Sequence, residues 1–175
     1  MSTGNDAGTQ SQEREFFMER VFDAPRDLVW KACTEAERLM QWWGPRGVTM
    51  RVATMDLRPG GRFHYCYVMP NGSEMWGIFV YREFVAPERL VFTNSFSDAE
   101  GTIVRAPFSA DWPLELMNTW TFSEQAGKTT ITMRAVPIHA TEAERKTFEG
   151  AFASLEQGSK AVSYTHLTLP TSDLV

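Results

Sequence analysis

The sequence predicts an α+β domain in which a curved antiparallel sheet packs against a C-terminal helix. The candidate elements follow one another as a strand, two short helices, six strands and a helix, and a run of strands between helices is typical of α+β folds. Short turns join the three strands predicted between residues 62 and 96, as in an antiparallel meander. The 175 residues are long enough for one domain with its own core.

The N-terminal part is predicted to hold a leader, one strand and two short helices. Residues 1–13 are rich in Gly, Ser, Thr and Gln without apolar periodicity, so we expect a disordered leader. Residues 15–22 are predicted to form a strand, and Asp23 is predicted to cap a helix that begins near the following proline. Thr34, with Glu37 three residues later, predicts the cap of a second short helix.

Six further strands are predicted from alternating apolar residues and from turn signals. Gly60 and Gly61 fit a bulge that bends the sheet, and Asn71-Gly72 is the strongest hairpin signal. Residues 97–113 mix Gly, Pro, Asp and Ser, and we expect a long loop there. The predicted strands, about seven with the first one, occupy residues 48–57, 62–69, 73–85, 89–96, 114–122 and 129–136.

The last helix is predicted to be the longest of the domain. Thr141 is its N-cap with Glu144 at the capping-box position, and the helical stripe stops near Gly158. Residues 161–175 carry no matching pattern and resemble a translated adapter read-through, so we interpret them as an irregular, non-native tail; a genuine irregular tail is the alternative. The domain is therefore assigned to 14–160. The apolar stripe of the helix is formed by Ala143, Phe148, Ala151, Phe152 and Leu155.

Charge and composition restrict the partners. The net charge of -5 contains no block of like charges, which argues against nucleic acid. No stretch approaches the roughly 18 apolar residues of a membrane span, and the start lacks the apolar run of a signal peptide. Cys33 and Cys66 are too few for a disulfide framework and are expected to be free thiols, so we expect a cytoplasmic protein. The oligomeric state is not determined by these patterns.

Aromatic side chains make up 13% of the chain, and they suggest the walls of a cavity. In the strand of residues 62–69, Phe63, Tyr65 and Tyr67 share one face by alternation. Plain core packing is the alternative, since cavities and cores use the same side chains. The residues predicted to line a ligand cavity are Trp43, Phe63, Tyr65, Tyr67, Trp76, Phe92, Trp120, Phe148 and Phe152. Trp42 and Trp43 are also expected to wedge the second helix against the sheet.

Candidate catalytic and metal-binding groups are few. His64 and Cys66 lie two residues apart on a strand, but a zinc site needs more ligands, and both alternate with the aromatic face. His139 precedes the last helix, where a solvated turn residue is the expected reading. No phosphate-binding loop, dinucleotide fingerprint, nucleophile elbow or HExxH motif is present. We therefore expect no catalytic residue, no metal and no cofactor.

Three strings of the sequence carry a family resemblance. FDAPRDLVWKACTEAERLMQWWGP, MDLRPGGRF and VAPERLVFT resemble the START-like SRPBCC superfamily, in the branch of the C-terminal domain of activators of the heat-shock-protein-90 ATPase. The match runs from about Glu15 to Gly158. It implies the helix-grip fold, a curved sheet wrapped around a long C-terminal helix with a cavity between them. The implied function is binding of a small hydrophobic molecule there; a chaperone ATPase-regulating interaction module and a cyclase- or hydrolase-type enzyme are the alternatives.

Overall fold

The computed structural model describes residues 14–43 and 47–155. The predicted leader, the predicted end of the last helix and the predicted tail lie outside the described residues. The elements are β1 Phe16–Phe22, α1 Arg26–Thr34, α2 Ala36–Trp42, β2 Thr49–Met55, β3 Arg62–Val68, β4 Glu74–Val85, β5 Arg89–Ser97, β6 Leu116–Gln125, β7 Lys128–Pro137 and α3 Glu142–Gly150. None of the helices in this part of the chain has the length and apolar character to span a membrane.

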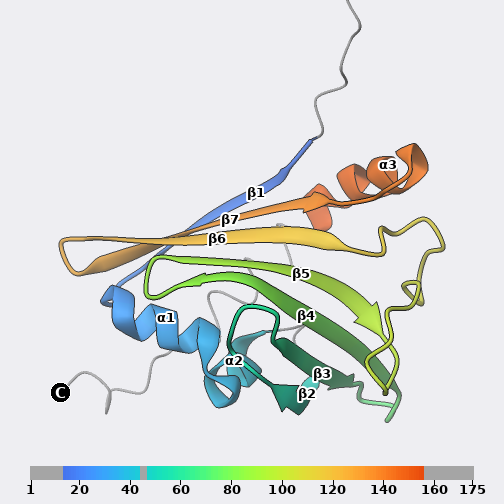
Figure 1. Ribbon diagram of the computed structural model, residues 1–175, viewed down its shortest axis with the longest axis horizontal. Helices are drawn as coiled ribbons and strands as arrows, with labels where there is room; N and C mark the ends of the chain where they lie inside the picture. The colour runs from blue at the N-terminus through green and yellow to red at the C-terminus, as the bar shows by residue number, and fades with distance from the viewer. Residues whose placement is uncertain (1–13, 44–46, 156–175) are drawn as a thin grey trace, which may run out of the picture.

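The seven strands form one antiparallel sheet in the order β1-β7-β6-β5-β4-β3-β2. Strands β2 to β7 each pair with their neighbour in sequence, and β1 completes the sheet beside β7. Figure 1 shows the sheet as a twisted layer with α1 and α2 near one end and α3 near the other. The predicted α+β class and the number of strands are confirmed.

The three helices cover one face of the sheet, which we call the helix-covered face. Near α1 and α2, Leu39 and Trp42 pack into the larger core cluster of this face. At the opposite end, Phe148 of α3 packs with Leu116 and Ala135 in a second cluster. Two separate groups of apolar side chains therefore attach the helices to the sheet.

The helix caps differ from those predicted. α1 begins after Pro25, whose carbonyl accepts hydrogen bonds from the first turn, and Asp23 does not cap it. Thr34 does not cap α2, because its hydroxyl donates back to the Trp30 carbonyl at 2.7 Å. α2 instead begins after Glu35, which makes no side-chain cap. The two predicted helices are present, but their N-termini are capped by backbone carbonyls and not by the predicted side chains.

The predicted bulge at Gly60 and Gly61 is wrong, because the bulges of the sheet lie elsewhere. The pairing registers shift at Ala53 in β2 and at Arg82 in β4. Gly60 has a φ of +81°, and a Cβ at Gly61 would overlap the backbone of the same turn. Both glycines therefore serve the tight turn between β2 and β3.

α3 begins as predicted, at a capping threonine. The Thr141 hydroxyl accepts a hydrogen bond from the Glu144 backbone N–H at 3.1 Å. Phe148 is 1% exposed, as its place in the predicted stripe requires. Ala143 was wrongly placed in that stripe, because it is exposed while Glu144 is buried.

Candidate ligand-binding face

Most of the predicted cavity residues lie together on the helix-covered face. One cluster brings together Trp43, Phe63, Tyr65, Tyr67, Phe92 and Trp120. Within it, the rings of Phe63 and Tyr65 are stacked with centroids 4.9 Å apart, and those of Trp43 and Trp120 are 5.7 Å apart. Phe148 and Phe152 belong to the second cluster, at the α3 end. The predicted group is thus divided between two clusters of one face.

Trp76 is the exception, and its predicted place on this face is wrong. It pairs with Cys66 across β3 and β4, and residues opposite one another share a face of the sheet. Its ring centroid is 4.8 Å from that of His64, and the Arg51 guanidinium lies 5.5 Å from it on the same face. Trp76 therefore lies on the opposite face, together with His64 and Cys66.

The histidines and cysteines form no metal-binding cluster in the described part of the chain. His64 and Cys66 point away from the aromatic face, as predicted, and His64 Nε2 lies 3.0 Å from the Asp98 carbonyl oxygen. Cys33 and Cys66 are both free and buried. His139 is an exposed turn residue with a φ of +52°. Within residues 14–43 and 47–155, no three potential ligands lie close enough to hold a metal.

Phe79 of β4 is a central member of the face that the sequence did not identify. Its ring is stacked on that of Phe92 with centroids 4.4 Å apart. The rings of Phe63 and Trp43 lie at 5.2 Å and 5.4 Å. Phe79 therefore connects the aromatic residues of β3 and β5 to the end of α2.

Burial separates the residues of the face into a floor and an accessible part. The rings of Phe63, Phe92, Trp120 and Phe148 are 0%, 1%, 3% and 1% exposed, so they pack as core. Trp43, Tyr67 and Phe152 are half-buried. A ligand that leaves the core in place would contact the half-buried group.

The hydroxyls of Tyr65 and Tyr67 and the indole N–H of Trp43 are uncharged polar groups of this wall. Burial raises the pKa of Tyr65 to about 12, although the neighbouring Trp43 indole and Tyr67 hydroxyl lower it in part. Burial also raises the pKa of Tyr67. The indole N–H of Trp43 is buried and makes no hydrogen bond of good geometry, although it lies close enough to influence Tyr65. The aromatic wall thus presents neutral hydrogen-bonding groups.

Two asparagines lie between the two core clusters, and sequence reasoning did not identify them. Asn118 lies on β6 between Leu116 of the α3 cluster and Trp120 of the larger cluster. Its Nδ2 donates to Asn94 Oδ1 at 2.6 Å and to the Leu116 carbonyl at 3.2 Å. Both asparagines are half-buried. An amide pair therefore interrupts the aromatic and aliphatic side chains at the centre of the face.

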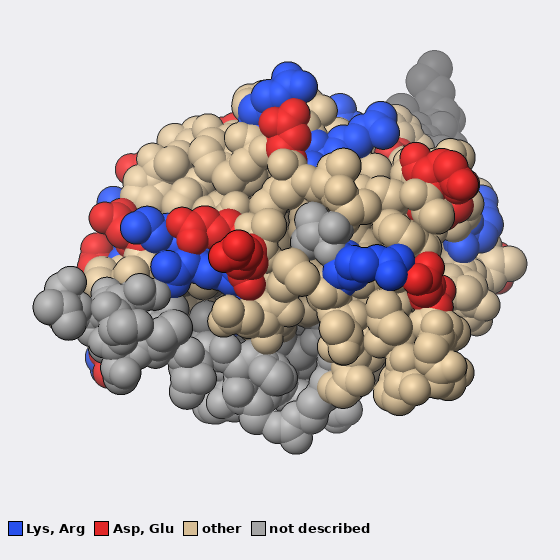
Figure 2. Space-filling view, turned by 90° about the horizontal axis from the view of Figure 1, so that it is seen from below, with Lys and Arg blue, Asp and Glu red and all other residues tan. Residues whose placement is uncertain are grey.

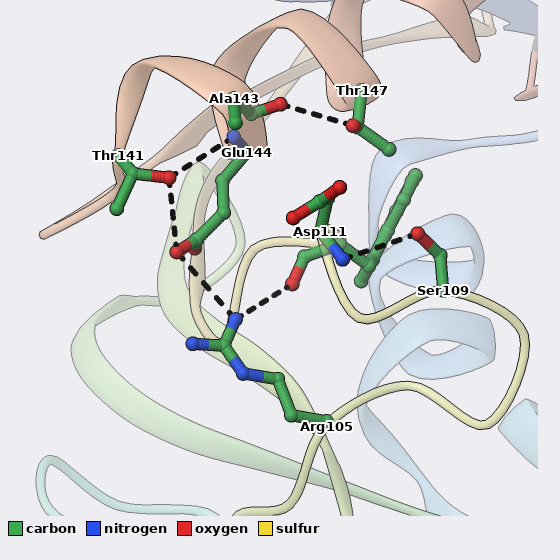
Figure 3. A network of polar contacts seen from close by, with 8 residues as sticks. Arg105, Ser109, Asp111, Thr141, Ala143, Glu144 and Thr147 are labelled. Carbon is green, nitrogen blue, oxygen red and sulfur yellow. Dashed lines mark hydrogen bonds and ion pairs between the residues drawn. The ribbon is translucent and has the colours of Figure 1, made fainter.

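The loop between β5 and β6 is joined to the beginning of α3. Figure 3 shows Arg105 of this loop directed towards Glu144, with the two side chains 3.5 Å apart. Arg105 also donates to the Trp112 carbonyl, and the ring of Trp112 contacts that of Phe148. Phe108 of the same loop is 62% exposed. The predicted long loop is thus attached by one ion pair and by aromatic contacts.

Charged side chains do not gather into an area of one sign on the face seen in Figure 2, where basic and acidic residues lie interspersed. Nucleic acid binding requires a basic surface that follows the phosphates. This face offers no such surface.

The comparisons with known proteins identify both a family and a fold. The family model of Activator of Hsp90 ATPase homolog 1-like protein matches residues 23–160. The comparison with curated proteins gave no match.

Solved structures with the same fold come from several bacteria. Protein Ms6760 from Mycobacterium smegmatis is 24% identical, with a TM-score of 0.70 over 91% of this chain and 93% of that chain. A protein from Arthrobacter aurescens is 23% identical, with a TM-score of 0.70 over 86% of this chain and 81% of that chain. The AHSA1 protein from Silicibacter pomeroyi is 18% identical, with a TM-score of 0.58 over 87% of this chain and 100% of that chain. These likenesses establish the fold that this chain shares with them.

Proposed function

This chain belongs to the Activator of Hsp90 ATPase homolog 1-like family, and from that premise we propose that it binds a small hydrophobic molecule on the helix-covered face of the sheet. The binding surface of the proposal consists of the half-buried side chains over the aromatic floor. Trp43 and Tyr67 lie at the α2 end of this surface, and Asn94 and Asn118 lie at its centre.

The observation that carries the proposal is the buried indole N–H of Trp43, which lacks a well-formed hydrogen bond within an aromatic wall. A buried donor without an acceptor costs about 1–3 kcal/mol, so native structures contain few such groups. An acceptor atom on an apolar ligand would satisfy the group once the side chains packed around the indole move aside to admit it. The rings of Trp43, Tyr67 and their neighbours would meanwhile cover the rest of the molecule.

The charge distribution at the centre of the face favours an uncharged ligand, whereas the partly buried guanidinium of Arg20 lies on β1 at the edge of the sheet. Among the buried residues of the described chain, Glu144 is the one carboxylate, and Arg105 pairs with it at the α3 end. Burying an unpaired ion on an apolar surface is costly, whereas a neutral molecule pays no such cost. We therefore assign to the face a ligand that is apolar in most of its surface.

The proposal is tested with naphthalene as the probe, by calorimetry and by thermal unfolding. Binding to the folded state stabilises it by about 2.7 kcal/mol at a hundred times Kd, which raises Tm by several degrees. Trp43→Ala should weaken binding about tenfold or more, because it removes one wall of the surface. Trp76→Ala is the matched control, since it removes a half-buried tryptophan from the opposite face.

Two outcomes would contradict the proposal. One is the absence of any Tm increase with naphthalene and with decanol, each at its solubility limit. The other is an equal loss of affinity in Trp43→Ala and Trp76→Ala, which would place the probe away from the helix-covered face.

A further inference from the structure

We propose that Asn94 and Asn118 recognise a neutral amide group of the ligand, either a primary amide or a lactam. This inference rests on the proposed function and names the chemical class of the molecule bound there. At the centre of the face, among the described residues, the asparagine pair is the feature that would select a ligand with a polar functional group over a plain hydrocarbon.

The register of the sheet places both carboxamides among apolar side chains. Asn94 lies opposite Phe79 on β4, and Asn118 lies opposite Phe92 on β5. On the other side of Asn118, the opposite residue is Ala135 of β7. A polar pair in such surroundings is retained against its desolvation cost, which raises the question of what its remaining hydrogen-bonding groups do.

The orientation of both amides follows from one backbone carbonyl. The Leu116 carbonyl oxygen can only accept, so the Asn118 atom that lies 3.2 Å from it is the nitrogen. The same nitrogen lies 2.6 Å from an atom of Asn94, which must therefore be the oxygen. This arrangement uses both N–H groups of Asn118 and directs the Asn94 oxygen towards them.

Two complementary groups remain after these bonds are formed. Asn94 Nδ2 keeps its N–H donors, and Asn118 Oδ1 keeps its acceptor capacity, with no bond to another described residue. Neither atom is among the buried unsatisfied groups of the described chain, so both are accessible. The pair thus presents a donor beside an acceptor on an aromatic floor.

A ligand that matches this pair needs an acceptor beside a donor. A C=O next to an N–H, as in a primary amide or a lactam, meets the requirement. A carboxylate has no donor and would face the Asn118 oxygen, and the positions of β4, β5 and β6 on this face carry no basic side chain to compensate. An ester or an ether also lacks the donor. The matching class is therefore a neutral amide attached to an apolar skeleton.

Three probes of one size separate the amide from its skeleton. These are 2-quinolinone, which has both groups, N-methyl-2-quinolinone, which has the carbonyl alone, and naphthalene, which has neither. By calorimetry, 2-quinolinone should bind about tenfold more tightly than its N-methyl form, the order of magnitude of one to two net hydrogen bonds.

The variants Asn94→Leu and Asn118→Leu identify the groups responsible. Each should reduce the tenfold preference to about twofold or less, and cooperative thermal unfolding of the variant without ligand reports that it is folded. Asn94→Asp keeps an oxygen for Asn118 but removes the N–H donors, so it should lose the preference as well. Thr119→Val is the matched control, because Thr119 alternates with Asn118 and lies on the opposite face of β6.

The outcomes distinguish this inference from the proposed function. Equal affinity for all three probes would overturn the amide assignment and leave the binding of apolar molecules intact. A preference for 2-quinolinone that survives in Asn94→Leu and Asn118→Leu would also overturn it. If none of the three probes binds, both the inference and the proposed function are wrong.

Discussion

The phenol ring of Tyr65 lies across Gly77 on the neighbouring strand, in the space that a side chain would occupy. A Cβ built at Gly77 would stand 2.5 Å from both Cζ and the hydroxyl oxygen of Tyr65. Tyr65 is 5% exposed, and its ring also contacts those of Phe63, Tyr67 and Phe79. The tyrosine therefore fills the space that the glycine leaves.

Gly77→Ala should destabilise the protein by about 1–3 kcal/mol, because the added methyl group overpacks a ring that cannot move freely. Urea unfolding measures the change. In a Tyr65→Ala background the same substitution should cost far less, since the ring is absent. An equal cost in both backgrounds would show that the penalty does not come from the contact with Tyr65.

Thr129→Val should cost about 1–3 kcal/mol of folding free energy. The hydroxyl of Thr129 is fully buried and donates to the Ala24 carbonyl at 2.7 Å, and valine has nearly the same shape without the donor. Thr130→Val, on the other face of β7, is the control and should change stability by about 0.5 kcal/mol or less. Thermal unfolding of the two variants and of the wild type measures the loss of stability in each variant. Similar Tm values for both variants would contradict the prediction.

Arg105→Met should loosen the loop between β5 and β6. Its charged partner Glu144 is buried, so losing the pair should cost about 1–2 kcal/mol and speed the hydrogen exchange of the Val104 amide, which bonds to the Phe96 carbonyl. Lys146→Met breaks an exposed pair with Glu142 and should cost about 0.5 kcal/mol or less. Unchanged exchange at Val104 in Arg105→Met would show that the ion pair does not hold the loop.

Alkaline pH should destabilise the fold through its buried tyrosines. Burial raises the pKa of Tyr65 to about 12 from an ordinary value near 10, and it raises the pKa of Tyr81 in the same direction. The unfolded chain therefore loses these protons first, so stability is full below about pH 10 and falls as the pH rises towards 12.

The contribution of Tyr65 to this fall is about 2 kcal/mol by pH 11.5, and Tyr65→Phe should remove it. Urea unfolding at several pH values between 8 and 11.5 gives the free energy of unfolding as a function of pH for the wild type and for Tyr65→Phe. The wild type should lose stability more steeply than the variant above pH 10. Parallel curves would mean that Tyr65 ionises alike in the folded and unfolded chains.

The register of the central hairpin shows why the fold could be predicted better than the site. Asn71-Gly72 correctly indicated the hairpin, but a two-residue turn there would have paired Tyr67 with Trp76. The observed connection has a third residue, Pro70, because the Met69 N–H bonds to the Ser73 carbonyl. A shift of one residue exchanges the two faces of a strand, and it places Trp76 on the far side.

Local sequence patterns do not predict which residues meet across the sheet. Asn94 and Asn118 are 24 positions apart and have no motif in common, so their contact depends on the register of β5 against β6. The predicted cap at Thr34 was wrong for a local reason. A threonine hydroxyl can accept a hydrogen bond from the turn that follows it, as a cap, or donate to a carbonyl of the preceding turn, as Thr34 does. Alternation and turn residues thus predict the elements, whereas the contacts of the site follow from registers set by the whole sheet.

The position of β1 also has a consequence for synthesis on the ribosome. β1 is made first, yet its partner β7 is made last among the strands, and Thr129 is 105 positions from Ala24. At about 5–20 residues per second, β1 waits on the order of ten seconds for its partner, while β2 to β6 can pair as they emerge. Phe17 and Val21 remain 50% and 62% exposed even in the finished sheet. In the nascent chain, this first strand with its exposed apolar side chains therefore has no partner strand until β7 has been synthesised.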